Sequence, residues 1–126
     1  MSRIEILYVD DDDDIRTIVE LSLGMDPDIR LETFASALPA LERLKSWSPD
    51  AVLRDVMMPD MDGPTLLALF RQQSAATDTP VIFMTAKGRD ADISYYRALG
   101  AVGVILKPFD PLHLAREIRT ILNRPR

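Results

Sequence analysis

Short apolar runs alternate along the chain with longer stretches in which apolar residues recur every three or four positions. The short runs have the length and the side-chain composition of buried strands. They lie at residues 4–9, 29–34, 51–55, 81–85 and 102–106. The pattern therefore predicts five strands.

The longer stretches have the periodicity of amphipathic helices. The recurring apolar residues of the first, second and last stretches are Ile15, Ile18, Val19 and Leu23; Leu38, Leu41 and Leu44; and Leu114, Ile118, Ile121 and Leu122. Ser36 can cap the second helix, and Gly24 and Gly100 stand where helices should stop. Gly63-Pro64 and Asp110-Pro111 each indicate a cap followed by proline at the first helical position.

Strands and helices thus alternate from one end of the chain to the other. Parallel strands need a crossover of this length, and the crossovers place helices on both faces of the sheet. We therefore predict an α/β fold, a doubly wound (βα)5 three-layer sandwich on a five-stranded parallel sheet. Since no linker, repeat or second composition regime interrupts the sequence, residues 1–126 should form a single domain, with no output domain in this chain.

The composition narrows the possible partners. The 126 residues carry a formal net charge of −5, which argues against nucleic acid or an anionic membrane as the main partner. There is no cysteine, the start does not resemble a signal peptide, and no apolar stretch approaches the roughly 18 residues of a membrane span. We expect a cytoplasmic protein that binds neither nucleic acid nor a membrane directly.

Ionisable and hydroxyl side chains collect where the predicted strands end. The first strand is followed by Asp10 and Asp11, and the third ends on Asp55. The fourth ends on Thr85, and the fifth is followed by Lys107. Carboxyl ends of parallel strands share one edge of the sheet, where ligands of such folds bind. Each residue alone has an ordinary interpretation, such as a helix-terminal charge or a surface lysine, but their joint placement favours a functional site.

This set of side chains has the chemistry of a phosphoryl-transfer site. Clustered carboxylates need a cation, and oxygen ligands without histidine or cysteine favour Mg²⁺, with Mn²⁺ as a second possibility. The Lys107 ammonium and the Thr85 hydroxyl can bind phosphoryl oxygens. Asp55 can then be the nucleophile that accepts the phosphoryl group as an acyl phosphate.

The other aspartates of the acidic run are predicted to serve the first helix. Asp12 is placed to cap that helix. Asp13 and Asp14 fall in its first turn, where negative charge meets the positive end of the helix dipole. The run therefore divides into site residues and helix-terminal residues.

Four segments make the sequence similar to a known family: ILYVDDDDDIR, PDAVLRDVMMPDMDG, TPVIFMTA and GAVGVILKPFDP. With these segments in this order and spacing, the chain resembles the receiver domain of two-component response regulators over essentially its full length. The resemblance implies a flavodoxin-like fold with strand order 2-1-3-4-5. It also implies a signalling phosphoacceptor that catalyses only its own phosphorylation and dephosphorylation, not an enzyme that acts on a free substrate.

The resemblance assigns roles to the acidic residues. Asp55 is the expected phosphoacceptor, which takes its phosphoryl group from a phosphohistidine of a histidine kinase or a phosphotransfer protein. Asp11, Asp55 and the backbone carbonyl of Met57 are the expected Mg²⁺ ligands, and Asp10 is expected to reach the metal through water.

The resemblance also implies a switch. Thr85 matches the family's switch hydroxyl, Lys107 its phosphate-pairing lysine, and Pro108 its cis-proline. Phosphorylation is expected to draw Thr85 inward and to bias the face built from the fourth helix, the fifth strand and the fifth helix. A downstream protein is expected to bind that face, and a phosphorylation-dependent homodimer is a further possibility.

Some positions depart from the family pattern or have an open role. Val104 stands where the family usually has an aromatic residue, whose ring swings inward as the threonine moves. The resemblance therefore does not extend to this coupled movement of threonine and aromatic ring. Arg54 occupies a strand position that is normally apolar, where it could pair with an acid or reach a partner. Tyr95 and Tyr96 cannot both face the core, and His113 is expected to be solvated.

Three other functions fit the sequence less well. A phosphohydrolase of the haloacid dehalogenase type needs a second acid two residues after the nucleophile, where this chain has Met57. A calcium-binding loop with Asp10, Asp12 and Asp14 at its first, third and fifth positions would lack the glycine and the glutamate that such loops require. A receiver-like docking module that accepts no phosphate is disfavoured because all five site residues are present.

Overall fold

The computed structural model describes residues 3–55, 79–86 and 89–123. Within these residues, five parallel strands form one sheet in the order β2-β1-β3-β4-β5. The strands are β1 (Ile4–Val9), β2 (Ile29–Phe34), β3 (Ala51–Asp55), β4 (Val81–Thr85) and β5 (Gly103–Leu106). The predicted strand order is confirmed, and so are the predicted strands, except that β5 begins one residue later than predicted.

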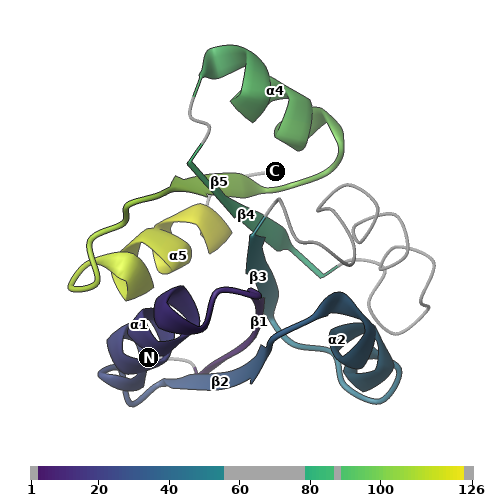
Figure 1. Cartoon of the computed structure of the whole chain (residues 1–126), viewed down its shortest axis with the longest axis vertical. Coiled ribbons are helices and arrows are strands. Elements are labelled where there is room, and N and C mark those ends of the chain that lie inside the picture. Colours follow the sequence, from purple (N-terminus) through teal and green to yellow (C-terminus); the bar gives the residue numbers. More distant parts are fainter. Residues whose placement is uncertain (1–2, 56–78, 87–88, 124–126) are drawn as a thin grey trace.

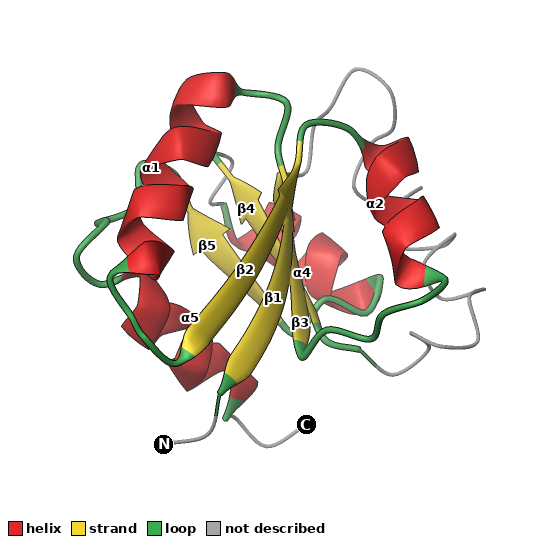
Figure 2. Cartoon of the chain, turned by 90° about the horizontal axis from the view of Figure 1, so that it is seen from below, coloured by secondary structure: helices red, strands yellow, loops and turns green. Residues whose placement is uncertain are grey.

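Helices cover both faces of the sheet (Figure 1). They are α1 (Asp13–Gly24), α2 (Ala37–Leu44), α4 (Asp90–Ala98) and α5 (Leu114–Leu122). Figure 2 shows α1 and α5 on one side of the sheet and α2 on the other, where α4 also packs. The predicted three-layer α/β architecture is therefore confirmed. In the part of the chain that the structure describes, no helix is both long enough and apolar enough to cross a membrane.

Two predictions fall outside the described residues. One is the helix predicted to begin at Gly63-Pro64, and the other is the backbone carbonyl of Met57 as a metal ligand. The predicted site residues that the structure describes lie at the ends of β3 and β4 or directly after β1 and β5.

Strand β1 lies between β2 and β3 in the sheet and is covered by helices on both faces. Leu7 and Val9 pack in the cluster that includes α2 and α4, whereas Ile6 and Tyr8 pack in the cluster that includes α1 and α5. All four side chains are fully buried. Layers of helix on both faces explain why this strand is apolar at nearly every position.

The predicted helix boundaries are mostly confirmed. Asp12 Oδ1 accepts the backbone N–H groups of Asp14 and Ile15 at 3.0 and 3.1 Å, so Asp12 is the predicted cap of α1. Gly100 has a φ of 111°, the left-handed conformation that ends a helix such as α4. Ser36 is the N-cap residue of α2, but its side chain forms no capping hydrogen bond within the described residues.

Helix α5 begins later than predicted. The sequence places Pro111 at its first position, whereas the helix begins at Leu114. Asp110 Oδ1 accepts the N–H of Leu112 at 2.9 Å, and the Asp110 carbonyl accepts the N–H of His113 at 3.0 Å. Asp110 therefore closes a turn before the helix instead of capping it, and the predicted start was wrong. His113 is exposed, as predicted, with its Nδ1 2.7 Å from Asp110 Oδ2.

Gly103 lies where β5 passes close to α5. A Cβ added to Gly103 would lie 2.6 Å from Ile121 Cγ2 and 3.0 Å from Ile121 Cδ1. Gly103→Ala is therefore expected to lower the free energy of unfolding by about 1–3 kcal/mol, because Ile121 or the helix must shift. Urea-induced unfolding measures this change.

Gly24 provides the matched control for Gly103. It is the last residue of α1, as predicted, and a Cβ added there meets nothing within 4 Å. Gly24→Ala is expected to leave the stability unchanged or to raise it by up to about 1 kcal/mol. A Gly103→Ala variant as stable as the wild type would contradict the close approach of β5 and α5.

Candidate functional site

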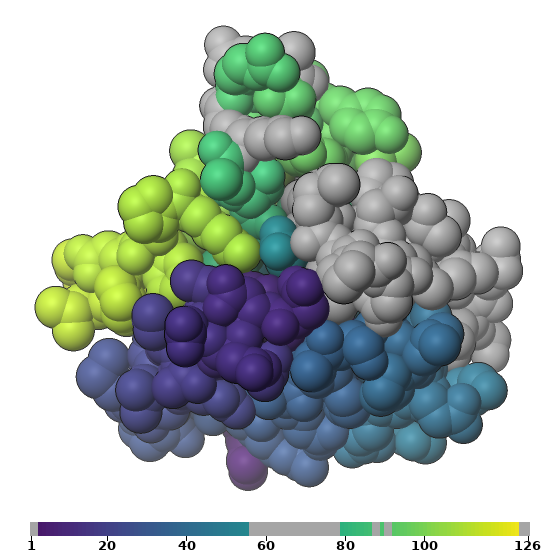
Figure 3. Space-filling model, in the orientation of Figure 1, coloured from purple at the N-terminus to yellow at the C-terminus, as the bar shows by residue number. Residues whose placement is uncertain are grey.

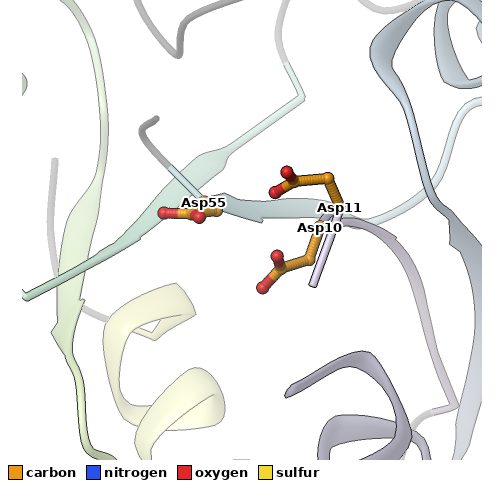
Figure 4. Close-up of side chains that lie close together, drawn as sticks. All are labelled: Asp10, Asp11 and Asp55. Atoms are coloured by element: carbon orange, nitrogen blue, oxygen red, sulfur yellow. The ribbon is translucent and has the colours of Figure 1, made fainter. Parts of the chain in front are cut away.

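Three aspartates from two neighbouring strands come together at the carboxyl edge of the sheet. Asp10 and Asp11 follow β1, and Asp55 is the last residue of β3. One carboxylate oxygen from each lies within 4.8 Å of the others. Figure 3 shows that segments from the beginning, the middle and the end of the chain meet on this face of the molecule, and Figure 4 shows the three side chains. The proximity predicted from the strand ends is confirmed.

Asp10 is fully buried, and each of its carboxylate oxygens accepts a hydrogen bond. Oδ2 accepts from the Tyr8 hydroxyl at 2.6 Å, and Oδ1 accepts from the Asp12 backbone N–H at 3.0 Å. The Asp10 carbonyl accepts from Arg16 Nη1 at 2.9 Å. Burying a carboxylate costs free energy unless hydrogen-bond donors of the protein replace the water that it loses. The donors around Asp10 therefore offset the cost of burying its carboxylate.

Lys107 lies between two of the aspartates. Its Nζ is 3.4 Å from Asp10 Oδ2 and 3.4 Å from Asp55 Oδ2. The side chain of Lys107 is 19% exposed and that of Asp55 is 18% exposed, so the attraction between them is less screened than in water. The Lys107 N–H donates to the Thr85 carbonyl at 2.8 Å, and the Lys107–Pro108 peptide bond is cis, as predicted.

Thr85 is buried at the end of β4. It shares a face of the sheet with Phe83, whose ring packs edge-to-face on Tyr96 with 5.4 Å between ring centroids. Val104 is partly buried against the same cluster. Tyr96 is therefore the core-facing member of the tyrosine pair, and Tyr95 is exposed.

Arg54 is fully buried, and it is one of the largest side chains in the core. Its Nε donates to the backbone carbonyl of Asp55 at 2.5 Å. The guanidinium thus lies against the strand end that carries Asp55. A contact with the backbone of its own neighbour was not among the interpretations that the sequence suggested for Arg54.

Tyr8 is a site residue that sequence reasoning missed. It is fully buried among residues of α1 and α5, and its hydroxyl reaches the Asp10 carboxylate. Burial, and then the hydrogen bond to Asp10, raise the pKa of Tyr8 far above its ordinary value, so the hydroxyl stays a donor at physiological pH. The signal in the sequence was a side chain with a polar tip at an inward strand position two residues before an acid.

The donor set suits a hard divalent cation. One carboxylate oxygen from each residue lies within 4.8 Å of the others, and the cluster joins one buried, one exposed and one partly buried aspartate. Oxygen donors of this kind are the ligands that Mg²⁺ prefers in proteins. The residues present therefore fit the cation that the sequence predicts.

Comparison with known proteins agrees with this geometry. The chain matches the family model of the response regulator receiver domain over residues 6–119. It is 33% identical over 121 residues to response regulator Rre1 of Synechocystis sp., an alignment that covers 96% of this chain and 52% of that protein. The chain spans about half the length of the curated relatives that it matches.

Solved structures show the same fold. The chemotaxis response regulator CheY4 of Vibrio cholerae superposes with a TM-score of 0.86 at 30% identity, covering 95% of this chain and 99% of that one. The receiver domain of the sensor histidine kinase PA1611 from Pseudomonas aeruginosa superposes with a TM-score of 0.83 at 25% identity, covering 98% and 100%. The PA1611 structure has a magnesium ion coordinated in its active site cleft.

Proposed function

Because the chain belongs to the response regulator receiver domain family, we propose that Asp55 accepts a phosphoryl group from a phosphohistidine on a histidine kinase or a phosphotransfer protein. The observation that carries this proposal is the position of Lys107, whose Nζ is 3.4 Å from Asp55 Oδ2 beside the acidic cluster. A carboxylate nucleophile, a cation site and an ammonium group are the parts that phosphoryl transfer needs.

In the proposed reaction, an Asp55 carboxylate oxygen forms a bond to phosphorus while the P–N bond of the phosphohistidine breaks. The electron pair of that bond leaves with the imidazole, which then takes up a proton. The Lys107 ammonium pairs with one phosphoryl oxygen, and the Thr85 hydroxyl donates to another. Bound Mg²⁺ would supply further neutralisation of the negative charge.

In this proposal, Asp11, Asp55 and the backbone carbonyl of Met57 would hold the Mg²⁺, and Asp10 would act through water. The contacts of Asp10 support its indirect role, because both carboxylate oxygens already accept hydrogen bonds from the protein. Asp11, by contrast, is exposed at the edge of the cluster.

The phosphorylated domain would act as a switch and not as an enzyme on a free substrate. Thr85, buried at the end of β4, would move toward the phosphoryl group and alter the surface formed by α4, β5 and α5. Tyr95 on α4 and Leu106 on β5 are exposed on this surface, at 54% and 45%, which suits binding of a downstream protein or of a second copy of the chain. The proposal takes residues 1–126 as one receiver domain that works in the cytoplasm.

The experiment is incubation of the purified protein with phosphoramidate and Mg²⁺, followed by intact-mass measurement. We expect a single adduct of about 80 Da that is lost in acid and in hydroxylamine, as an acyl phosphate is, and that does not form in excess EDTA. If the protein takes up no phosphoryl group under these conditions, it is better described as a docking module that accepts no phosphate.

Replacing Lys107 with alanine is expected to slow phosphorylation by about 100-fold, because a charge-stabilising donor is removed from the transferred group. The domain should stay folded, since the lysine is at the edge of the sheet and partly exposed. Phosphorylation rate and melting temperature are measured together. The control is Lys45→Ala, which removes an exposed lysine paired with Glu42 and should leave the rate unchanged. A collapse in the melting temperature of Lys107→Ala would make the lysine structural.

A further inference from the structure

We propose that Tyr8 is a positioning residue that keeps Lys107 available to Asp55. This inference rests on the proposed function, since it concerns the lysine that would pair with the phosphoryl group. Its physical basis is a competition between a hydroxyl and an ammonium for one carboxylate oxygen of Asp10.

The Tyr8 hydroxyl is held rigidly in place. The side chain is fully buried, and it packs in the cluster that includes Val19 and Leu23 of α1 and Leu114 of α5. A ring packed in a core keeps its rotamer, so its hydroxyl points in a fixed direction. That direction is toward Asp10 Oδ2, at 2.6 Å.

The same oxygen also contacts Lys107. Lys107 Nζ lies 3.4 Å from Asp10 Oδ2, a long contact beside the 2.6 Å bond from Tyr8. The other oxygen, Oδ1, already accepts the Asp12 N–H at 3.0 Å. Asp10 is therefore supplied with donors by its own chain segment and by Tyr8, and it holds the lysine only loosely.

This loose hold leaves Lys107 shared between two acids. Its Nζ is at the same 3.4 Å from Asp55 Oδ2 as from Asp10 Oδ2. Without the Tyr8 hydroxyl, Oδ2 of a fully buried carboxylate would lose its shortest hydrogen bond, and Lys107 is the donor already within reach. The ammonium would then move toward Asp10 and away from Asp55, because an unsatisfied buried carboxylate is the costlier of the two.

The test is Tyr8→Phe, which removes only the hydroxyl. At Mg²⁺ concentrations shown by titration to saturate each protein, the rate of phosphorylation by phosphoramidate is expected to fall about 2- to 10-fold, the equivalent of one net hydrogen bond. Thr33→Val is the matched control, since it removes only a hydroxyl that donates to the Glu20 carboxylate at 3.0 Å, outside the site, and should leave the rate unchanged. Tyr8→Leu is a second variant without the hydroxyl, and urea-induced unfolding shows that each protein is folded at the assay temperature.

A crystal structure of the folded variant separates positioning from general damage to the fold. We expect Lys107 Nζ within about 3 Å of Asp10 Oδ2 and farther from Asp55 than in the wild type. A wild-type rate in Tyr8→Phe, or an Nζ still midway between the acids, would overturn the inference while the proposed function stands. A wild-type protein that takes up no phosphoryl group at all would instead remove the proposed function.

Discussion

Replacing Asp55 with asparagine is expected to abolish the phosphoryl adduct and to leave the fold intact. An amide oxygen is a poor nucleophile, whereas a carboxylate oxygen can attack phosphorus directly. The fold should persist because Asp55 ends β3 with 18% of its side chain exposed. Removing one of three clustered carboxylates relieves repulsion, which offsets the attraction to Lys107 that is lost, so the variant should be about as stable as the wild type.

Intact mass after treatment with phosphoramidate and Mg²⁺ measures the effect of Asp55→Asn, and urea-induced unfolding checks its stability. Asp13→Asn serves as the control, because Asp13 is an exposed aspartate of the same protein in the first turn of α1. It should form the adduct at the wild-type rate. An adduct of the same size on Asp55→Asn would place the phosphoryl group on another residue.

Neutralising Asp10 and Asp11 together is expected to weaken Mg²⁺ binding by at least about 100-fold. Two of the three clustered carboxylates are lost in this double asparagine variant, and the remaining one cannot by itself hold a strongly hydrated cation. Isothermal titration calorimetry with MgCl₂ measures the dissociation constant of the variant and the wild type.

The same acidic run supplies the control for this experiment. Asp13 and Asp14 lie in the first turn of α1, next in sequence to the capping residue Asp12. The double variant Asp13→Asn/Asp14→Asn has the same change in net charge, yet it should bind Mg²⁺ as the wild type does and lose only about 0.3–1 kcal/mol of stability per residue. An equal loss of Mg²⁺ affinity in both double variants would mean that the overall field attracts the cation and that no specific site exists.

The acidic cluster could be predicted from the sequence because it depends on backbone topology. Once the short apolar runs are taken as parallel strands, Asp10, Asp11 and Asp55 must fall at one edge of the sheet, whatever the details of packing. The Asp12 cap could be predicted for a similar reason. It depends on local spacing, with the capped N–H groups two and three residues further along the chain.

Contacts that depend on side-chain reach could not be predicted in this way. Strand alternation places Tyr8 on the same face as Ile6, but it does not show that the Tyr8 hydroxyl reaches the Asp10 carboxylate, two residues further along the chain. The Arg54 contact with the Asp55 carbonyl likewise depends on how a long side chain folds back within the core. The predicted start of α5 was wrong because an aspartate before proline closes a turn as readily as it caps a helix.

The proposed role of Asp55 is tested most directly by locating the phosphoryl group on the wild-type protein. The protein is treated with phosphoramidate and Mg²⁺, reduced with borohydride to convert an aspartyl phosphate into homoserine, digested, and sequenced by mass spectrometry. We expect homoserine at residue 55 alone, and none when EDTA replaces Mg²⁺. A stable phosphoryl group on His113, the single histidine of the chain, or homoserine at Asp10 or Asp11 with none at Asp55, would contradict the proposed role.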